Sequence, residues 1–337
     1  MTDARLRARR LTPAAWCVAM AAADAPLGGL GWGLPISDEG DAPAGLDVRV
    51  LSPQGACIDA WFGAGAGHRA RSGAVAWRDD GHWLFGHIDA ADTGADLAET
   101  TRRAYLAVFA ALREAGRPPL LRLWNYLPRI NAEDGGLERY RRFNIGRQQA
   151  FIEAGHDAFE GAPAACAIGK RSGGLAIRFL AARQAPLPLE NPRQVPAYRY
   201  SAQFGPRSPS FSRAALADAG GGRLLLLISG TASIVGEHSV HAGDVQAQLR
   251  ETLANLQAVI DAAHARGTAR FTLADLDCTL YVRHAADADA IRHGFEAAVG
   301  PASHAARGAV YVEADICRSE LLVEIEGHAF APGVLLP

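Results

Sequence analysis

The order of helix and strand patterns in the C-terminal half of this chain is repeated in the half before it, and this repeat restricts the folds available. Strand-like apolar runs alternate with segments whose apolar residues recur at helical spacing. The elements predicted for the C-terminal half, in chain order, are strand 223–232, helix 244–266, strand 277–283, helix 285–298, and strands 308–316 and 321–329. The chain has 337 residues, a length that favours two domains over one.

The preceding half follows the same order at low sequence identity. Its predicted elements are strand 82–88, helix 95–115, strand 120–127, helix 137–153, and strands 163–168 and 174–182. Each half is therefore strand–helix–strand–helix–strand–strand. This order predicts an α+β fold in which each half forms one mixed β-sheet with its helices packed on one face.

Four segments follow from this organisation. Residues 1–45 carry no usable motif, residues 46–182 form the first domain, and residues 223–337 form the second domain. Between the domains, residues 183–222 are rich in Pro, Arg and Tyr, and we expect them to connect the halves without regular structure. A connection of that length is often functional.

Composition excludes several classes of protein. The 34 basic and 36 acidic residues give a net charge of −2, so no nucleic-acid footprint is expected. No apolar run reaches the ~18 to 20 residues of a membrane span. The five cysteines are widely spaced, which argues against a disulfide framework or a zinc site and favours a cytoplasmic protein. We expect no metal and no cofactor.

Three segments of the C-terminal half resemble RidA (YjgF) domains: ISG at 228–230, QLRETLANLQAVIDAA at 248–263 and LVEIEG at 322–327. Over about residues 80–330 the chain further resembles the chorismatases. The segments that carry this resemblance are RLWNYLPRIN (122–131), GRQQAF (146–151), YRYSAQFGPRSPSFSRA (198–214), ISGTASIVGEHSVHAGD (228–244) and EADICRSELLVEIEG (313–327). The resemblance implies two RidA-like (chorismate mutase-like) domains and an enzyme that cleaves the enolpyruvyl ether of chorismate.

By this resemblance Glu324 is the catalytic acid. We align it with Ile177 in the first half, so only one active site is expected. A vinyl ether is cleaved by protonating its terminal carbon, which requires a positioned general acid. On a strand Glu324 shares a face with Leu322 and Glu326, and partial burial would raise its pKa. The alternative from sequence alone is a surface residue paired with an arginine.

A dicarboxylate substrate calls for arginines, whose planar guanidinium binds carboxylates through two hydrogen bonds. The candidates are Arg147, Arg199, Arg207 and Arg213, with Tyr200 as a hydroxyl donor. Arg207 is favoured because Pro206 and Pro209 restrict the backbone around it. Any one of these arginines could instead be a solvated surface residue. Ala232 and Tyr126 are expected to line the pocket by resemblance.

Two positions bear on the product. Chorismatases that form a dihydrodiol tend to have Ala at the positions of Gly230 and Cys317, whereas those that form 3-hydroxybenzoate tend to have Gly and Cys. The resemblance therefore implies pyruvate and 3-hydroxybenzoate through intramolecular capture, with 4-hydroxybenzoate as a further product left open. The alternative for Cys317 is a small buried hydrophobic residue.

Two other functions remain open from the sequence. One is a RidA-type enamine or imine deaminase, in which an arginine holds a carboxylate and a glutamate positions water. The other is a non-catalytic protein that binds an aromatic acid. The assembly expected is a monomer or a homotrimer, because RidA domains form trimers whose sites lie between neighbours.

Overall fold

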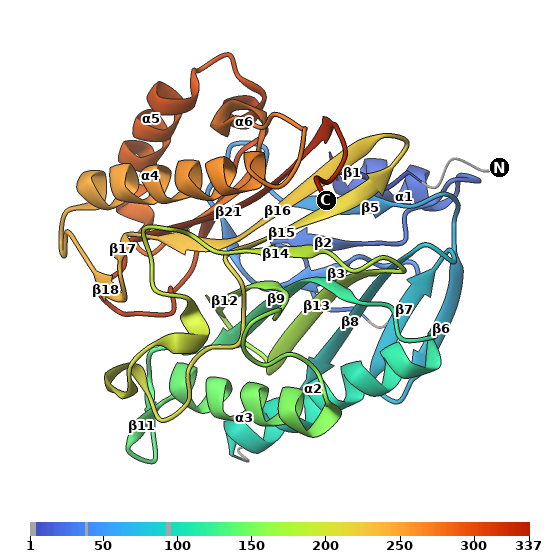
Figure 1. The fold of residues 1–337 in the computed structure, drawn as a ribbon, viewed down its shortest axis with the longest axis horizontal. Helices are drawn as coiled ribbons and strands as arrows, with labels where there is room; N and C mark the ends of the chain where they lie inside the picture. Colours follow the sequence, from blue (N-terminus) through green and yellow to red (C-terminus); the bar gives the residue numbers. More distant parts are fainter. Residues whose placement is uncertain (1–4, 38–39, 92–95) are drawn as a thin grey trace.

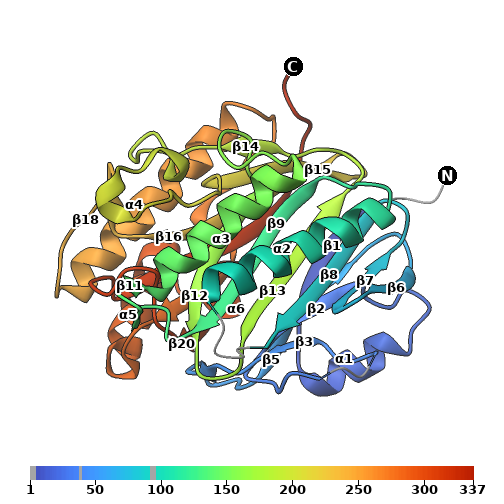
Figure 2. The same cartoon turned by 90° about the horizontal axis from the view of Figure 1, so that it is seen from below.

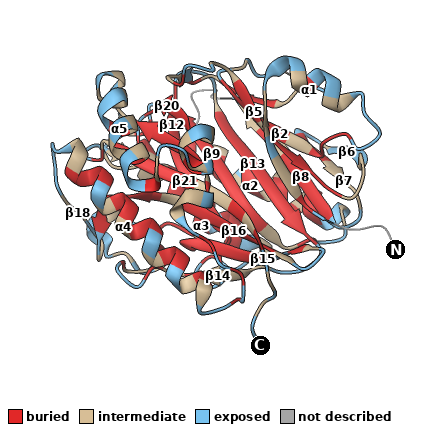
Figure 3. Ribbon diagram, turned by 90° about the horizontal axis from the view of Figure 1, so that it is seen from above, coloured by how far each residue is buried: buried red, intermediate tan, exposed pale blue. Residues whose placement is uncertain are grey.

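Two large β-sheets face each other, and each carries its helices on the outer side (Figure 1). The computed structural model describes residues 5–37, 40–91 and 96–337. Helices α4 and α5 lie at the top of Figure 1 and helices α2 and α3 at the bottom, with the sheets between them. Figure 3 shows that the central strands of both sheets are almost entirely buried.

The first domain contains a six-stranded mixed sheet in the order β12-β9-β13-β8-β7-β6. Its strands are β6 (His68–Ser72), β7 (Val75–Asp79), β8 (Trp83–Ala90), β9 (Leu120–Pro128), β12 (Ala164–Lys170) and β13 (Leu175–Ala182). Helices α2 (Leu97–Glu114) and α3 (Arg139–Ala154) lie side by side across one face of this sheet (Figure 2). Residue 95, where the helix was predicted to begin, lies outside the described residues. The short strands β10 (Glu133–Asp134) and β11 (Leu137–Glu138) form a hairpin before α3.

The second domain contains a seven-stranded sheet in the order β14-β15-β16-β21-β19-β20-β4. Its strands are β4 (Arg49–Val50), β14 (Leu187–Leu189), β15 (Ala214–Gly220), β16 (Arg223–Ala232), β19 (Asp277–Val282), β20 (Val310–Glu313) and β21 (Val323–Pro332). Helices α4 (Val245–His264), α5 (Ala288–Val299) and α6 (His304–Gly308) accompany it, and strands β17 (Ile234–Val235) and β18 (His238–Ser239) form a small hairpin. The predicted repeat order is thus present in both domains.

The N-terminal residues form a sheet of their own, which the sequence did not indicate. Its order is β1-β5-β2-β3, with strands β1 (Arg7–Leu11), β2 (Gly28–Trp32), β3 (Ala44–Leu46) and β5 (Cys57–Phe62), and helix α1 (Pro13–Met20) packs on it. The boundary expected at residue 45 falls inside this sheet, since β3 and β5 belong to it. Strand β4 instead pairs with β20 of the second domain.

The connecting segment 183–222 was expected to lack regular structure, and that expectation is wrong. Strands β14 and β15 lie within it and pair with each other at one end of the second sheet. Residues 214–220 read AALADAG, with no β-branched or aromatic residue, so local sequence gave little sign of a strand. The middle of the segment is irregular, apart from short helical turns at Ala197–Arg199 and Ala202–Phe204.

The side chains of each central strand alternate between two cores. On β21, Val323 and Ile325 pack toward the helices of the second domain, so Glu324 and Glu326 face the inner side. On β13, Ile177 packs toward the helices of the first domain. The predicted alignment of Ile177 with Glu324 is therefore wrong, because Ile177 lies on the helix-facing side of its sheet. The inner positions of β13 include Ala176 and Leu180. Strand β13 contains no acidic residue, so neither of its faces carries a counterpart of the Glu324 carboxyl.

Candidate active site

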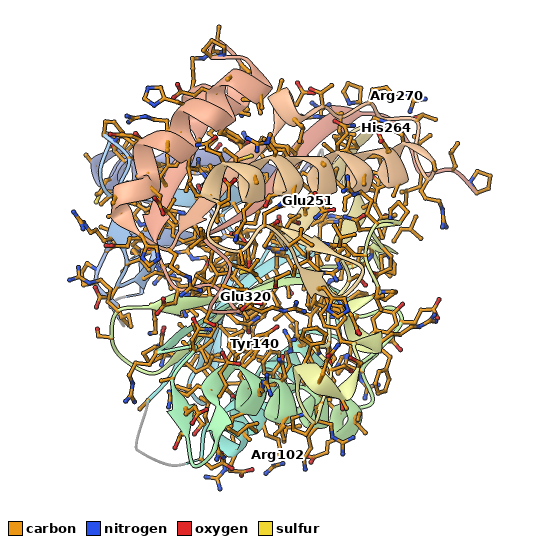
Figure 4. The ribbon with its side chains drawn as sticks, turned by 90° about the vertical axis from the view of Figure 1, so that its left-hand side faces the viewer. Arg102, Tyr140, Glu251, His264, Arg270 and Glu320 are labelled. Atoms are coloured by element: carbon orange, nitrogen blue, oxygen red, sulfur yellow. The ribbon has the colours of Figure 1, made fainter. Side chains whose placement is uncertain are left out.

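A cavity of about 460 Å³ lies between the two domains. Helix α3 and strand β12 of the first domain, strands β16 and β21 of the second, and the connecting segment all contribute to its wall. Seven of the predicted site residues line it: Glu324, Cys317, Gly230, Arg147, Tyr200, Arg213 and Ala232. Figure 4 labels Tyr140 and Glu320, two further lining residues, which lie between the upper second domain and the lower first domain.

Glu324 contributes a buried carboxyl group to this cavity. On β21, Glu324 pairs with Ala232 of β16 on one side and with Tyr281 of β19 on the other, and it is 4% exposed. Burial, and then the nearby carboxylate of Glu326, raise the pKa of Glu324 to about 8, while Arg122 and more distant arginines oppose the rise. The carboxyl group is therefore mostly protonated at pH 7. A protonated carboxyl that faces a cavity has the form that a general acid requires.

Gly230 provides the space that the Glu324 carboxyl occupies. A Cβ atom added at Gly230 would overlap Oε1 of Glu324 and would lie 2.9 Å from its Cδ and 3.2 Å from Cβ of Cys166. Any larger residue at this position must therefore displace the acid. The predicted influence of this position on the reaction thus has a direct steric basis.

Cys317 lies on the opposite side of Glu324, with Sγ 3.9 Å from Oε2. Burial, and then the neighbouring Glu324, raise the pKa of the Cys317 thiol well above its usual range. The thiol therefore stays protonated and is a poor nucleophile. It contacts the acid and lines the cavity as a small polarisable group.

Four arginines line the cavity. Arg141 is paired with Glu138 at 3.5 Å, and the other three, Arg147, Arg213 and Arg318, supply positive charge to the wall. Arg147 donates to Asn144 Oδ1 at 3.0 Å, and Arg213 donates to the Tyr200 hydroxyl at 2.7 Å. Arg318 donates to the carbonyl of Glu237 at 2.8 Å. Within the described part of the chain none of the three forms an ion pair with a carboxylate, and each keeps one buried nitrogen without a hydrogen-bond partner: Nε of Arg147, Nε of Arg213 and Nη2 of Arg318.

Aromatic rings hold these guanidinium groups in place. Arg213 lies 5.2 Å from the ring centre of Phe211 and 5.6 Å from that of Tyr200. Arg318 lies 4.1 Å from the ring centre of Phe204. Such contacts fix the plane of each guanidinium while leaving its edge free to bind an anion. The wall is therefore suited to a planar ligand with more than one carboxylate.

The structure places three sequence-predicted candidates away from the cavity wall. Arg207 and Arg199 are exposed and do not line it. The prolines beside Arg207 restrict its backbone, but its side chain points into solvent. Tyr126 is fully buried beneath the site, where its hydroxyl lies 2.9 Å from the hydroxyl of Tyr281.

Other lining residues were not singled out from the sequence. Cys166 on β12 and Tyr140 on α3 come from the first domain, and neither belongs to a motif with a known chemical role. Phe211 lies in the SPSFSRA segment that carried the resemblance, so its position there was the available signal. Arg318 follows Cys317 at a turn, where the sequence left its role undecided.

Comparison with known proteins decides the family. A 3-hydroxybenzoate synthase from Streptomyces hygroscopicus is 36% identical over 294 residues, which cover 84% of each chain. The chain belongs to the chorismatase family. A second relative, a chorismatase from Streptomyces rapamycinicus, is 38% identical and covers 80% of this chain and 81% of its own. Residues 59–181 match the family described as chorismatase FkbO/Hyg5-like, N-terminal.

A solved chorismatase structure has the same fold. It superposes with a TM-score of 0.85 at 31% identity and covers 98% of this chain and 99% of its own. The predicted chorismatase resemblance and the predicted α+β fold are thereby confirmed. Among the described residues, no helix is both long and apolar enough to span a membrane, and no group of three or more His, Cys, Asp or Glu side chains is arranged to hold a metal ion.

Proposed function

We propose that this protein is a chorismatase that converts chorismate to pyruvate and 3-hydroxybenzoate. The observation that carries the proposal is the buried carboxyl of Glu324, with a pKa of about 8, facing a cavity in which Arg147, Arg213 and Arg318 have no carboxylate partners among the described residues. A dianionic substrate supplies the missing negative charge. Arg147, Arg213 and Arg318 are the groups positioned to bind its two carboxylates.

The reaction begins with transfer of the Glu324 proton to the terminal methylene carbon of the enolpyruvyl group. That carbon becomes a methyl group, and positive charge develops on the ether side of the substrate. The carboxylate left on Glu324 stabilises this charge at close range. Because the site is buried, the stabilisation is stronger than it would be in water.

The oxygen of the ring's own 4-hydroxyl then displaces the protonated enolpyruvyl group, which leaves as pyruvate and takes the ether oxygen with it. The hydroxyl proton returns to Glu324. The ring oxide that results opens at one of its C–O bonds, and one ring proton is lost while the oxygen gains a proton, which gives 3-hydroxybenzoate. No water is consumed, so the atoms of the two products sum to those of chorismate and no cofactor is required.

Gly230 and Cys317 support this intramolecular route. Gly230 allows the carboxyl of Glu324 to lie close to β16, and Cys317 places a thiol rather than a water-binding group beside it. Capture by water instead would give the dihydrodiol. Formation of 4-hydroxybenzoate would require the oxygen to end on a different ring carbon. This is the alternative product to look for.

The test is incubation of the purified protein with chorismate in H₂¹⁸O and, separately, in D₂O. We expect 3-hydroxybenzoate without ¹⁸O on the ring and pyruvate with one deuterium in its methyl group. A Glu324→Gln variant is the control and should release no pyruvate above background. Absence of pyruvate from the unaltered protein would refute the function, and ¹⁸O on the ring would refute the intramolecular route.

We further propose a cytoplasmic monomer. All five cysteines are free thiols, which supports a reducing compartment. The inner faces of the two large sheets pack against each other and against the N-terminal sheet in one core, so contacts that RidA subunits make between chains are made here within one chain. Size-exclusion chromatography with light scattering at micromolar concentration should report a mass near 35.6 kDa, and a trimer mass would contradict this part of the proposal.

A further inference from the structure

A second carboxylate, Glu326, lies two residues after Glu324 on the same face of β21. It is 5% exposed and forms an ion pair with Arg122 of β9, whose side chain is 2% exposed. It also accepts a hydrogen bond of 2.9 Å from the hydroxyl of Tyr281, which in turn lies 2.9 Å from that of Tyr126. None of these four residues lines the main cavity, so substrate does not account for their arrangement.

The charges around Glu324 explain why this pair matters. The arginines that most favour the ionised form of Glu324 are Arg122 on β9, Arg213 just before β15 and Arg283 just after β19. Arg283 is paired with Asp315 at 2.7 Å. The thiols of Cys166 on β12 and Cys317 before β21 are neutral, because burial raises the pKa of both. Glu326 is therefore the anionic group that favours a protonated Glu324.

Removing Glu326 would leave Arg122 as an uncompensated cation in the buried layer beneath the acid. Arg122 already favours the ionised form of Glu324, and a buried cation does so more strongly when no anion offsets it, because low dielectric weakens screening. The pKa of Glu324 would then fall, and a smaller fraction of the protein would carry the proton of the general acid at neutral pH. A buried ion pair contributes little to stability compared with apolar side chains of the same size, so packing alone gives no reason for this pair.

We propose that Glu326 is a positioning residue that keeps Glu324 in its proton-bearing form by neutralising Arg122. This inference rests on the proposed function of Glu324 as the acid. It assigns a role to a second glutamate and an arginine that never contact the substrate. It also predicts that the two must be changed together to leave the acid undisturbed.

The first test is the pH dependence of kcat/KM for pyruvate release by Glu326→Gln. We expect the alkaline limb of the profile to move to lower pH by about one unit or more, so activity falls far more at pH 8 than at pH 6. Glu326→Asp keeps the charge and should keep the limb in place. A loss by the same factor at every pH would indicate a merely structural role and would overturn the proposal.

The second test removes both charges in Arg122→Gln with Glu326→Gln. We expect the alkaline limb to return toward its original pH, because no uncompensated cation remains. A limb that stays at the lower pH overturns the proposal. If Glu326→Gln does not fold, the single variant Arg122→Gln replaces it, and movement of its limb to lower pH would also overturn the proposal.

Direct titration separates this inference from the proposed function. The carboxyl stretch of Glu324, identified by difference infrared spectroscopy against Glu324→Gln, reports its protonation without any turnover. We expect Glu326→Gln to lower the pH at which this band disappears. That result would support the inference even if chorismate proved not to be the substrate, and an unmoved band would refute it even in an active chorismatase.

Discussion

Replacing Glu324 with Gln should abolish activity and at the same time make the folded protein more stable at neutral pH. The variant carries a neutral amide of nearly the same shape as the protonated carboxyl that the native site holds. In the unfolded chain the carboxyl titrates with an ordinary pKa of 4.5, whereas in the folded protein its pKa is about 8. The folded state therefore binds the proton more tightly, and ionisation favours unfolding.

The size of the effect follows from this difference. Between pH 4.5 and 8 the free energy of unfolding of the original protein falls by about 1.4 kcal/mol per pH unit, because the unfolded state has lost a proton that the folded state keeps. At pH 7, which is 2.5 units above 4.5, the accumulated cost is about 3 kcal/mol. The Gln variant has no proton to lose and avoids this cost.

The assay is urea unfolding of both proteins at pH 5, 6, 7 and 8. We expect the stability advantage of Glu324→Gln to grow steadily over this range. Glu320→Gln makes the same chemical change at an exposed position on the cavity rim. The free energy of unfolding of this control variant should therefore stay close to that of the original protein at every pH. If the difference in free energy of unfolding between Glu324→Gln and the original protein is constant from pH 5 to pH 8, the inference that burial keeps Glu324 protonated is refuted.

Three further predictions concern the product, the arginines and the N-terminal sheet. Gly230→Ala combined with Cys317→Ala should displace the acid and shift the product from hydroxybenzoate toward the dihydrodiol, and an unchanged ratio by chromatography would contradict the steric role. Arg213→Lys loses the planar contacts with Phe211 and Tyr200 and should raise KM by roughly tenfold or more, whereas the exposed Arg199→Lys should leave KM unchanged. Asp59→Ala leaves the mostly buried Arg10 without its partner and should lower the free energy of unfolding by about 3 kcal/mol. The exposed control Asp24→Ala should lower it by less than about 0.5 kcal/mol. Similar losses in the two variants would contradict a stabilising role for the buried ion pair.

The repeat could be predicted from local sequence patterns, whereas the assignment of Glu324 as the acid came from the resemblance to the chorismatases. Apolar spacing located the helices and strands of both domains, and alternation on the last strand placed Glu324 and Glu326 on one face. The alignment of Ile177 with Glu324 failed by one position, and one position on a strand exchanges the two faces. Sequence periodicity alone does not fix which face of β13 is turned inward.

Other features depend on contacts between distant parts of the chain. The N-terminal sheet is built from short strands such as GGLGW, whose glycines weaken any strand pattern, and packing of Trp32 against Tyr126 and Tyr281 gives it a place in the core. The sequence favoured Arg207 over Arg213 because prolines flank Arg207. Only Arg213 reaches the cavity, because the strand that begins beside it turns its side chain inward.

The joining of two similar domains in one chain explains how the site can be asymmetric. The inner face of β13 carries Arg178, which is fully buried and bonds to Asp89 and to the carbonyl of Gly45, where the corresponding face of β21 carries two glutamates. The second domain thus supplies the acid and its tuning carboxylate. The first domain supplies Arg147 from α3 to the cavity and Arg122 from β9 to the layer beneath it. Identical subunits would have to carry all of these groups in every copy, with a buried carboxylate or guanidinium left unpaired wherever a site was not formed. A single chain avoids that cost, because each half needs only the charges that the other half neutralises or uses.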